Sequence, residues 1–320
     1  MKKPLLRIVF VLLAATVAAQ GLFMLGSKGL QRYHHYRSHK FEMIFHGKHD
    51  HDLIFIGSSR TQSAIDPMQV DSICGTDSYN LGVEGANLAE FHLLFKAWLE
   101  NHPNPKMVLL TLDLSSFDLS RRFFNPVAYY PYLESEAVSA AMSADDRRPL
   151  LLRALPFLQV ADYDDYTRST CFKGLRGETD VHPAARVFQG FLNSDEKGMT
   201  GADTNIRYTT IPVDEEAKKM LEEIISTCRS RNIRLILTYA PEYREGWQKH
   251  ASNSAKILEM ITKLAAKHKL PFLRHDQLDI CSDPALFVNT GHLNKKGAAV
   301  YSRLLGETLR PYLIAPRPAD

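Results

Sequence analysis

The sequence predicts an α/β fold: a flavodoxin-like, three-layer α/β/α arrangement around a mostly parallel five-stranded sheet. Two patterns carry this prediction. Short continuous apolar runs of strand length recur along the chain, and helical patterns with one apolar face separate them. This alternation is typical of a parallel sheet covered by helices on both faces, with its ligand site at the carboxyl ends of the strands. The 320 residues, 45% of them hydrophobic, suffice for a full core.

The first three strands are predicted in the first third of the chain. The expected elements are a strand at 53–56, a helix at 64–73 interrupted by Pro67, a strand at 79–82, a helix at 87–100 and a strand at 107–112. The alternation then stops, and residues 118–210 contain an aromatic-rich stretch, a leucine-rich helix near 149–158 and glycine-spaced segments. We interpret this region as a large insertion after the third strand.

The alternation resumes near residue 213. The expected elements are a helix from about 214 to 228, a strand at 233–239, a helix at 254–267, a strand at 271–273 and a helix at 294–309. Residues 51–320 are therefore predicted to form one α/β domain that carries the insertion.

Residues 1–27 are predicted to be a signal anchor or transmembrane segment. A basic N-terminus precedes the uncharged apolar run 8–25, which is close to the roughly 20 residues that cross a bilayer as a helix. The small residues at 17–19 leave a cleaved signal peptide as the alternative. We expect an anchor, with the globular part outside the cytoplasm, in the periplasm or at the cell surface.

Residues 28–50 form a basic juxtamembrane stretch. Phe41, Ile44 and Phe45 are interspersed with basic residues there, which predicts a segment at the bilayer surface. His49-Asp50-His51-Asp52 could in principle hold a metal, but a solvated linker is the preferred interpretation. No metal and no cofactor is predicted.

The composition excludes some classes of function. The net charge is only +3 and the basic residues are spread along the chain, so nothing indicates a nucleic-acid partner. The cysteines contain no Cys-x-x-Cys pair, which argues against a zinc knuckle or a thioredoxin-like site. Disulfides and small buried hydrophobes remain the two interpretations of Cys74, Cys171, Cys228 and Cys281.

Two distant segments contain the residues of a candidate active site. Ser59 lies in Gly57-Ser58-Ser59-Arg60, where a strand pattern changes to a helical one, beside the unpaired N–H groups of a helix start. His292 lies in Asn289-Thr290-Gly291-His292-Leu293-Asn294, just before the last helix. A serine hydroxyl needs a base to act as a nucleophile at neutral pH, and His292 is the candidate base. Without Ser59 the histidine would be interpreted as a residue near a helix cap.

These two segments and a third resemble the sequence blocks of the SGNH or GDSL hydrolase superfamily, in particular a cell-envelope branch whose first block reads Gly-Ser-Ser. The resemblance covers residues 51–117 and 213–310. It places the nucleophile on Ser59. The second block matches Asn80-Leu81-Gly82-Val83-Glu84-Gly85, and the resemblance implies an oxyanion hole made by the backbone N–H groups of Ser59 and Gly85.

The chain departs from the family pattern at two positions. Asn289 stands where the last block normally has aspartate; it can orient the imidazole of His292 but brings no negative charge to it. The third block, normally Gly-x-Asn-Asp, is replaced by Leu112-Asp113-Leu114-Ser115-Ser116. One missing oxyanion donor can cost about 2.7–4 kcal/mol of transition-state stabilisation, unless a serine hydroxyl such as that of Ser115 replaces it.

The resemblance implies an esterase or O-acyltransferase acting on acyl esters, either of a cell-envelope glycan or of a small molecule. Ser59, His292 and Asn289 are the expected catalytic residues. The two departures support an alternative: a catalytically degenerate protein of the same fold that binds glycans or acts as an envelope scaffold. Arg60, Ser115 and Tyr239 are weaker candidates for substrate binding, with ion-pair, capping and turn roles as their alternatives.

Overall fold

The computed structural model describes residues 2–33, 36–144, 147–163, 165–178, 189–192, 197–199 and 209–314. The chain divides into two compact units. Unit 1 comprises Met1–Gly47 and Asn125–His182, and unit 2 comprises Lys48–Phe124 and Pro183–Asp320. Parts of the predicted insertion, at 179–188, 193–196 and 200–208, lie outside the described residues.

Unit 2 contains the predicted sheet, and every strand pair in it is parallel. Its strands are β1 (Leu53–Ile56), β2 (Ser78–Asn80), β3 (Met107–Thr111), β4 (Arg234–Tyr239) and β5 (Phe272–Arg274). The order across the sheet is β2-β1-β3-β4-β5, with Leu53 opposite both Ser78 and Met107. This is the flavodoxin-like order, so the predicted α/β class and five-stranded parallel sheet are confirmed.

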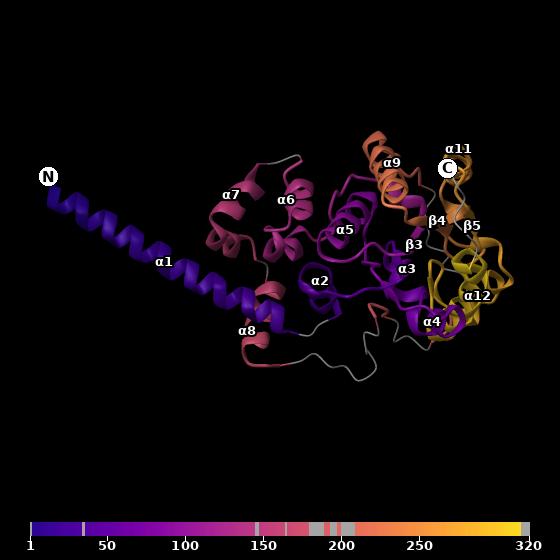
Figure 1. Ribbon diagram of the computed structural model, residues 1–320, viewed down its shortest axis with the longest axis horizontal. Helices are drawn as coiled ribbons and strands as arrows, with labels where there is room; N and C mark the ends of the chain where they lie inside the picture. Colours follow the sequence, from indigo (N-terminus) through magenta and orange to yellow (C-terminus); the bar gives the residue numbers. More distant parts are fainter. Residues whose placement is uncertain are drawn as a thin grey trace. The chain divides into compact units, whose positions relative to one another are not determined.

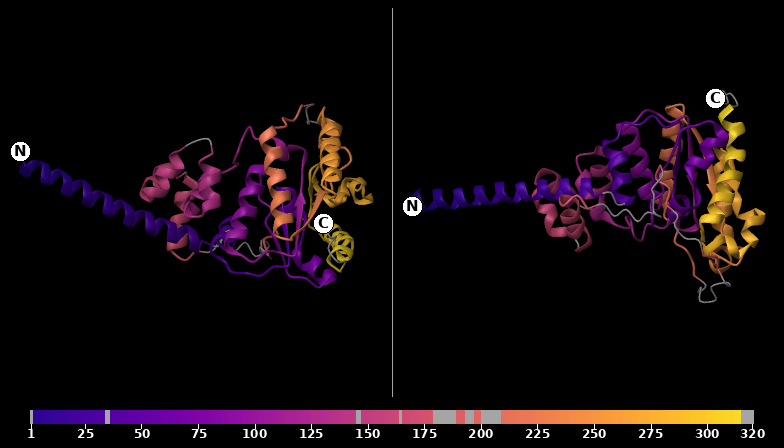
Figure 2. Two further views of the ribbon diagram at one scale, coloured as in Figure 1. Left: turned by 45° about the horizontal axis from the view of Figure 1, so that its top comes forward. Right: turned by 90° about the horizontal axis from the view of Figure 1, so that it is seen from below.

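Helices cover both faces of this sheet. Those of unit 2 are α3 (Ser59–Ala64), α4 (Pro67–Cys74), α5 (Leu88–Asn101), α9 (Glu215–Ser230), α10 (Trp247–His250), α11 (Ser254–Lys267) and α12 (Lys295–Ile314). On one face, Phe55 and Leu109 pack against Val70, Tyr301 and other residues of α4 and α12. Helices α5 and α9 pack together on the other face, and the two views of Figure 2 show α12, in yellow, across the sheet from them.

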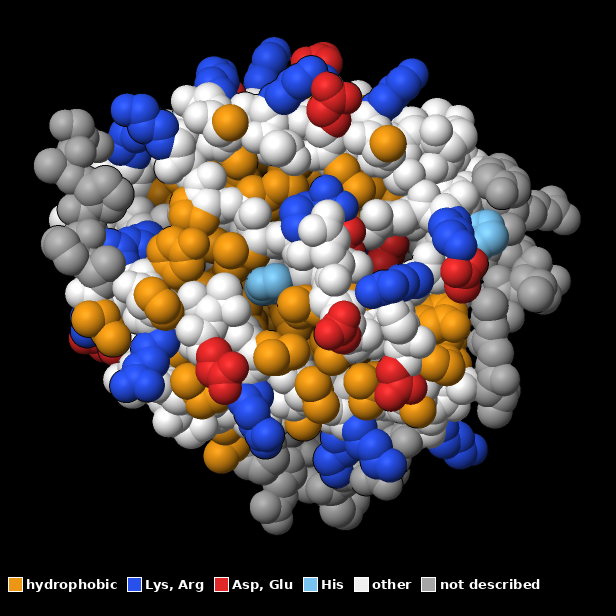
Figure 3. All heavy atoms as spheres, turned by 90° about the vertical axis from the view of Figure 1, so that its right-hand side faces the viewer, with side chains coloured by type: hydrophobic (Ala, Val, Ile, Leu, Met, Phe, Trp, Pro, Cys, Tyr) orange, Lys and Arg blue, Asp and Glu red, His pale blue; other side chains and the backbone are white. Residues whose placement is uncertain are grey.

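Short elements complete unit 2. They are the 3-10 turns η1 (Leu114–Phe117), η4 (His275–Gln277), η5 (Asp279–Ser282) and η6 (Pro284–Leu286), and the antiparallel pair β6 (Phe287–Asn289) and β7 (His292–Leu293). Figure 3 shows one face of this unit, where hydrophobic side chains gather near the middle and charged side chains lie around a hollow.

The region after β1 differs from the single interrupted helix that the sequence predicts. Helix α3 already begins at Ser59, and α4 is a separate helix that begins at Pro67. Proline suits the first position of a helix, because its missing N–H would have no partner there, and the side chain of Asp66 caps α4 by accepting from the N–H of Met68. Pro67 thus starts a helix instead of interrupting one.

Unit 1 is helical. It consists of α1 (Lys2–Arg32), α2 (Tyr36–His46), η2 (Pro126–Tyr132), α6 (Glu136–Met142), α7 (Arg148–Ala154), η3 (Pro156–Asp162) and α8 (Asp165–Leu175). Helix α1 is long and apolar enough to cross a membrane, and its 18-residue apolar window is 0% buried within the protein. Figure 1 shows α8 beside the C-terminal part of α1.

The hydrophobic residues of α2 are buried within unit 1, whereas the sequence analysis expected them at a bilayer surface. Phe41 and Phe45 are 2% and 6% exposed, and they pack against Tyr129 and Tyr132 of η2. The rings of Phe45 and Tyr132 stack with centroids 4.3 Å apart. These aromatic side chains therefore form a buried cluster between α2 and the insertion.

The remaining sequence hypotheses concern cysteines and metals. All four cysteines are free thiols; Cys171, Cys228 and Cys281 are buried and Cys74 is half-buried. His51 bonds to Asp77 at 2.9 Å. Within the described ranges, no group of three or more His, Cys, Asp and Glu residues is placed to hold a metal ion.

Candidate active site

The turn between β1 and α3 places Ser59 at the start of a helix. Ser58 is the N-cap, and its hydroxyl accepts a hydrogen bond from the N–H of Arg60 at 3.2 Å. A Cβ on Gly57 would lie 2.0 Å from Oγ1 of Thr61 and 3.0 Å from Thr111, so only glycine allows the chain to pass here. This close packing fixes Ser59 at the carboxyl edge of the sheet.

The structure brings Ser59 and His292 together across 233 residues of sequence. The hydroxyl of Ser59 lies 2.8 Å from Nε2 of His292, which is within the reach required of a nucleophile and its base. His292 belongs to the small β6–β7 hairpin, in which Asn289 pairs with His292. The hairpin also packs against α3, so one local unit positions both residues.

Asn289 fixes the orientation of the imidazole. Its Oδ1 accepts three hydrogen bonds, each of 3.0 Å, from Nδ1 of His292 and from the backbone N–H groups of Gly291 and His292. Because Oδ1 is only an acceptor, Nδ1 must carry the proton of the neutral ring, and Nε2 then presents its lone pair to Ser59. The oxygen therefore selects the tautomer that a general base needs.

Replacing Asn289 by aspartate tests what a negative charge adds at this position. Asn289→Asp keeps the oxygen acceptor and places a carboxylate beside Nδ1, and the exposure of Asn289 avoids the cost of burying that charge. We expect the ester-hydrolysis kcat to rise on the order of 10- to 100-fold, because the carboxylate stabilises the imidazolium. Steady-state kinetics on an aryl acetate measure this, with Asn289→Ala as the loss-of-orientation control. A kcat for Asn289→Asp at or below that of the natural protein would contradict it.

The protonation of His292 predicts the pH dependence. Burial lowers the pKa of His292, and the positive charge of Arg60 lowers it further. Only the neutral imidazole accepts the serine proton, so a lowered pKa extends activity to lower pH. We expect the acidic limb of kcat/KM to fall with an apparent pKa below 6.5, the ordinary value for histidine. A profile of kcat/KM against pH measures this apparent pKa. A value above 6.5 would be inconsistent with the environment of His292.

Two backbone N–H groups are available beside Ser59. Within the described part of the chain, the N–H groups of Ser59 and Gly85 donate no hydrogen bond, and both residues line the same cavity. The loop of Gly85 is held by buried Asn80, whose amide donates to the carbonyls of Thr61 and Ile65 at 2.8 Å and accepts from the N–H of Gly82. Asn80, the asparagine of the second block, therefore fixes the conformation of this loop through its hydrogen bonds.

Gly85 should not tolerate a side chain. Its φ is +70°, in the left-handed region, and an added Cβ would lie 2.5 Å from the ring of Phe124. We expect Gly85→Ala to lower kcat by about 100-fold, the order of one lost oxyanion donor, while the fold persists. Gly75→Ala is the matched control, because Gly75 also has a positive φ, +68°, but lies in open space at the end of α4. If Gly85→Ala and Gly75→Ala have equal kcat values, the backbone N–H of Gly85 does not take part in the reaction.

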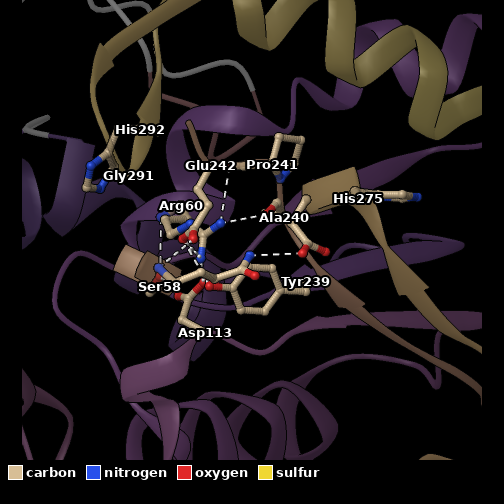
Figure 4. A network of polar contacts seen from close by, with 12 residues as sticks. Ser58, Arg60, Asp113, Tyr239, Ala240, Pro241, Glu242, His275, Gly291 and His292 are labelled. Carbon is tan, nitrogen blue, oxygen red and sulfur yellow. Dashed lines mark hydrogen bonds and ion pairs between the residues drawn. The ribbon is translucent and has the colours of Figure 1, made fainter. Parts of the chain in front are cut away.

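Arg60, the residue after Ser59, lies in a buried ionic cluster (Figure 4). Arg60 is 8% exposed, and its guanidinium bonds to Asp113 at 2.7 Å and to the carbonyl of Ala240 at 2.5 Å. The guanidinium also lies 3.7 Å from Glu242 and 4.7 Å from the centre of the Tyr239 ring. The second carboxylate oxygen of Asp113 accepts a hydrogen bond from the hydroxyl of Ser58. Each of these groups thus has a partner on another element of the edge of the sheet.

The charges of this cluster depend on one another. Burial raises the pKa of Glu242, and the nearby Arg60 offsets part of that effect. Burial disfavours the charge of Arg60, but Asp113, Tyr239 and Glu242 raise its pKa overall, so it stays charged. Arg60 therefore ties the β1 turn to the ends of β3 and β4.

The weaker candidates occupy different places. Ser115 is exposed on η1 and lines the cavity, whereas the hydroxyl of Ser116 accepts from the N–H of Asp113 at 2.7 Å. Tyr239 is 0% exposed, and its hydroxyl donates to Glu242 at 3.0 Å. Sequence reasoning gave no role in the site to Asp113 or Ser58. The position of each, two residues after the last residue of a strand, was the available signal.

The cavity above Ser59 has a volume of about 530 Å³, within the range of small-molecule sites. Its walls combine apolar groups of Leu114, Phe124 and Ile211 with polar groups of Arg121 and Asp118.

No protein-family model and no curated protein matches this chain. Among solved structures, it is similar to a GDSL-like lipase from Bacteroides thetaiotaomicron, with 12% identity over 81% of this chain and 88% of that one, at a TM-score of 0.41. It is also similar to a variant of an acetyl-xylooligosaccharide esterase from Geobacillus, with 13% identity over 85% and 96% of the two chains, at a TM-score of 0.38. These similarities to solved structures are distant. The candidate active site is therefore assigned from the strand order of this chain and from the contact between Ser59 and His292.

Proposed function

We propose that this chain is a serine esterase or O-acyltransferase that acts on acyl esters of a cell-envelope glycan. The contact of 2.8 Å between the hydroxyl of Ser59 and Nε2 of His292, at the base of an open cavity, is the observation that carries the proposal. Asn289 supports it by selecting the basic tautomer, and the unpaired N–H groups of Ser59 and Gly85 support it by offering a site for an oxyanion.

The proposed reaction has two halves. Oγ of Ser59 attacks the ester carbonyl while Nε2 of His292 takes the serine proton, and the N–H groups of Ser59 and Gly85 stabilise the oxyanion. The tetrahedral intermediate collapses, the imidazolium gives its proton to the leaving alcohol, and an acyl-serine remains. Water or a sugar hydroxyl then loses a proton to Nε2 of His292 as it attacks the acyl group. The second tetrahedral intermediate collapses, and the imidazolium returns this proton to Oγ of Ser59, which frees the serine. Water gives hydrolysis, and a sugar hydroxyl gives transfer.

The proposal includes anchoring in a membrane by α1. No residue in the apolar window of α1 is buried in the protein, and its mean hydropathy of 2.4 suits a lipid environment. Basic residues lie close to both ends of the apolar run, at positions 2, 3 and 7 and at positions 28, 32, 37 and 40. The proposed orientation starts on the cytoplasmic side, which places the globular units outside the cytoplasm.

Asn289 favours one alternative, a catalytically degenerate protein of the same fold that binds glycans or acts as an envelope scaffold. In the described residues the only side chain bonded to Nδ1 of His292 is an uncharged amide, so the imidazolium that forms during catalysis lacks a counter-charge. The cavity would then hold a glycan without cleaving it.

An acetate-transfer assay separates these functions. Full-length protein in detergent is given acetylated xylooligosaccharides with isotope-labelled acetyl groups, with and without an unacetylated glycan acceptor. Labelled free acetate indicates a hydrolase, and label on the acceptor indicates a transferase. Ser59→Ala is the blank, and Ser72→Ala, which removes an exposed serine on α4, controls for the substitution. Glycan retention without Ser59-dependent release or transfer would replace the proposal with the binding alternative.

A further inference from the structure

Unit 1 exposes an apolar surface on α7, η3 and α8. Segment 149–161 contains Arg153 as its one charged residue and Gln159 as its one other strongly polar residue. Side chains that a water-soluble protein would bury are exposed on it: Leu150 47%, Leu151 50%, Leu155 41% and Val160 40%. On α8, Phe172 is 65% exposed and Tyr166 is 50% exposed. Clustered apolar exposure of this kind marks an interaction site.

Both polar side chains of segment 149–161 have partners within the protein. Arg153 bonds to the carboxylate of Glu136 at 2.7 Å and to the carbonyl of Glu134. Gln159 is 2% exposed and donates to the carbonyl of Leu152 at 3.2 Å. Both polar side chains are therefore satisfied within the protein, whereas the apolar side chains of Leu150, Leu151 and Leu155 are exposed.

The apolar surface is continuous with α1. Both η3 and α8 pack against α1, and α8 crosses it at a backbone distance that only small residues allow. A Cβ on Gly29 would lie 2.1 Å from the carbonyl oxygen of Cys171, and one on Gly174 would lie 1.8 Å from that of Gly29. Close glycine-mediated crossings are typical of helices that pack in or near lipid. The crossing lies at the C-terminal end of the apolar run, where a spanning helix leaves the bilayer.

Basic side chains accompany the apolar ones. Arg147 and Lys173 are exposed, and Arg148, Arg168 and Arg176 are exposed while paired with Asp162, Asp165 and Glu178. Exposed arginines and lysines beside leucine and phenylalanine are the composition of segments that bind anionic lipid surfaces.

We propose that residues 148–163 and 165–176 form a platform that sits in the headgroup layer of the bilayer that α1 crosses. The occupant of the exposed apolar surface is lipid, because that surface adjoins a helix already suited to lipid. The platform takes the place that the sequence analysis assigned to the juxtamembrane stretch, residues 28–50. The inference rests on the proposed anchoring by α1 and is independent of the chemistry at Ser59.

Depth-resolved quenching in vesicles tests the platform. The full chain with Cys74→Ser, which removes its most accessible thiol, carries a single NBD label at Leu151→Cys or Val160→Cys. Leu12→Cys marks the bilayer interior, and Lys263→Cys marks the charged face of α11. Each protein is reconstituted into phosphatidylcholine–phosphatidylglycerol vesicles that contain doxyl-labelled lipid with the quencher high or low on the acyl chain.

We expect the labels at 151 and 160 to be quenched most by the shallow doxyl group, the label at 12 by the deep one, and the label at 263 by neither. Quenching at 12 without quenching at 151 and 160 would overturn the platform and leave the anchor intact. Absence of quenching at 12 as well would overturn both. Emission at 151 that changes with protein density but not with doxyl lipid would show that a second copy of the chain covers the surface, which also overturns the proposal.

Discussion

Ser59→Ala and His292→Ala should each lower the ester-hydrolysis kcat on the order of 10³- to 10⁶-fold. The two side chains act as one unit: without the imidazole the hydroxyl keeps its proton, and without the hydroxyl the imidazole has no nucleophile to activate. The effects should therefore not add, and the double variant should match the single ones. Hydrolysis of an aryl acetate by the purified proteins measures this.

Ser72→Ala supplies the control, because it removes a serine hydroxyl whose partner is the local carbonyl of Gln69 in an exposed helix. Its kcat should equal that of the natural protein. Additive losses in the double variant, or Ser59→Ala retaining activity comparable to Ser72→Ala, would show that the two residues do not form a catalytic pair.

Arg60→Met should lower the free energy of unfolding by about 3–5 kcal/mol. The substitution keeps much of the side-chain volume but leaves the carboxylates of Asp113 and Glu242 buried without their cation, at 5% and 3% exposure. Their desolvation cost then stands uncompensated. Urea unfolding followed by the fluorescence of Trp98, which is 0% exposed, measures the loss.

Lys106→Met is the matched control for Arg60→Met. It breaks the ion pair with Asp52, whose 2.8 Å length is close to the 2.7 Å between Arg60 and Asp113, but the Lys106 side chain is 66% exposed. Exposed pairs contribute about 0–1 kcal/mol, so this variant should remain close to the natural protein. Similar losses for the two variants would mean that the ionic cluster of Arg60 is not a structural requirement of the site.

Much of the fold could be predicted from local sequence. The strands β1, β3 and β4 each contain a run of three or four consecutive apolar residues, and burial on both faces of a parallel sheet favours that pattern. Ser59 and His292 were predicted because each lies in a recognisable block at a strand end. The helix bounds near Pro67 were predicted wrongly, because a proline can either interrupt a helix or occupy its first position. The sequence alone did not show which of these applies to Pro67.

The parts that sequence could not predict depend on long-range contacts. Asp113 appears in the chain as an isolated acid between leucines, and only folding places it beside Arg60 and Ser58. The same holds for Phe45, whose partner Tyr132 lies in the insertion. An amphipathic pattern shows that a face will be covered but not whether lipid or protein covers it. For this reason Phe41 and Phe45 were predicted at a bilayer surface, whereas the structure buries them against the insertion.

Labelling by a fluorophosphonate probe tests the central claim most directly, because the probe reacts with a serine only when a base activates it. We predict that the full-length protein is labelled on Ser59, as located by mass spectrometry of the peptide, and that His292→Ala abolishes the label without unfolding the protein. Absence of labelling in the natural protein, or equal labelling in His292→Ala, would contradict the account.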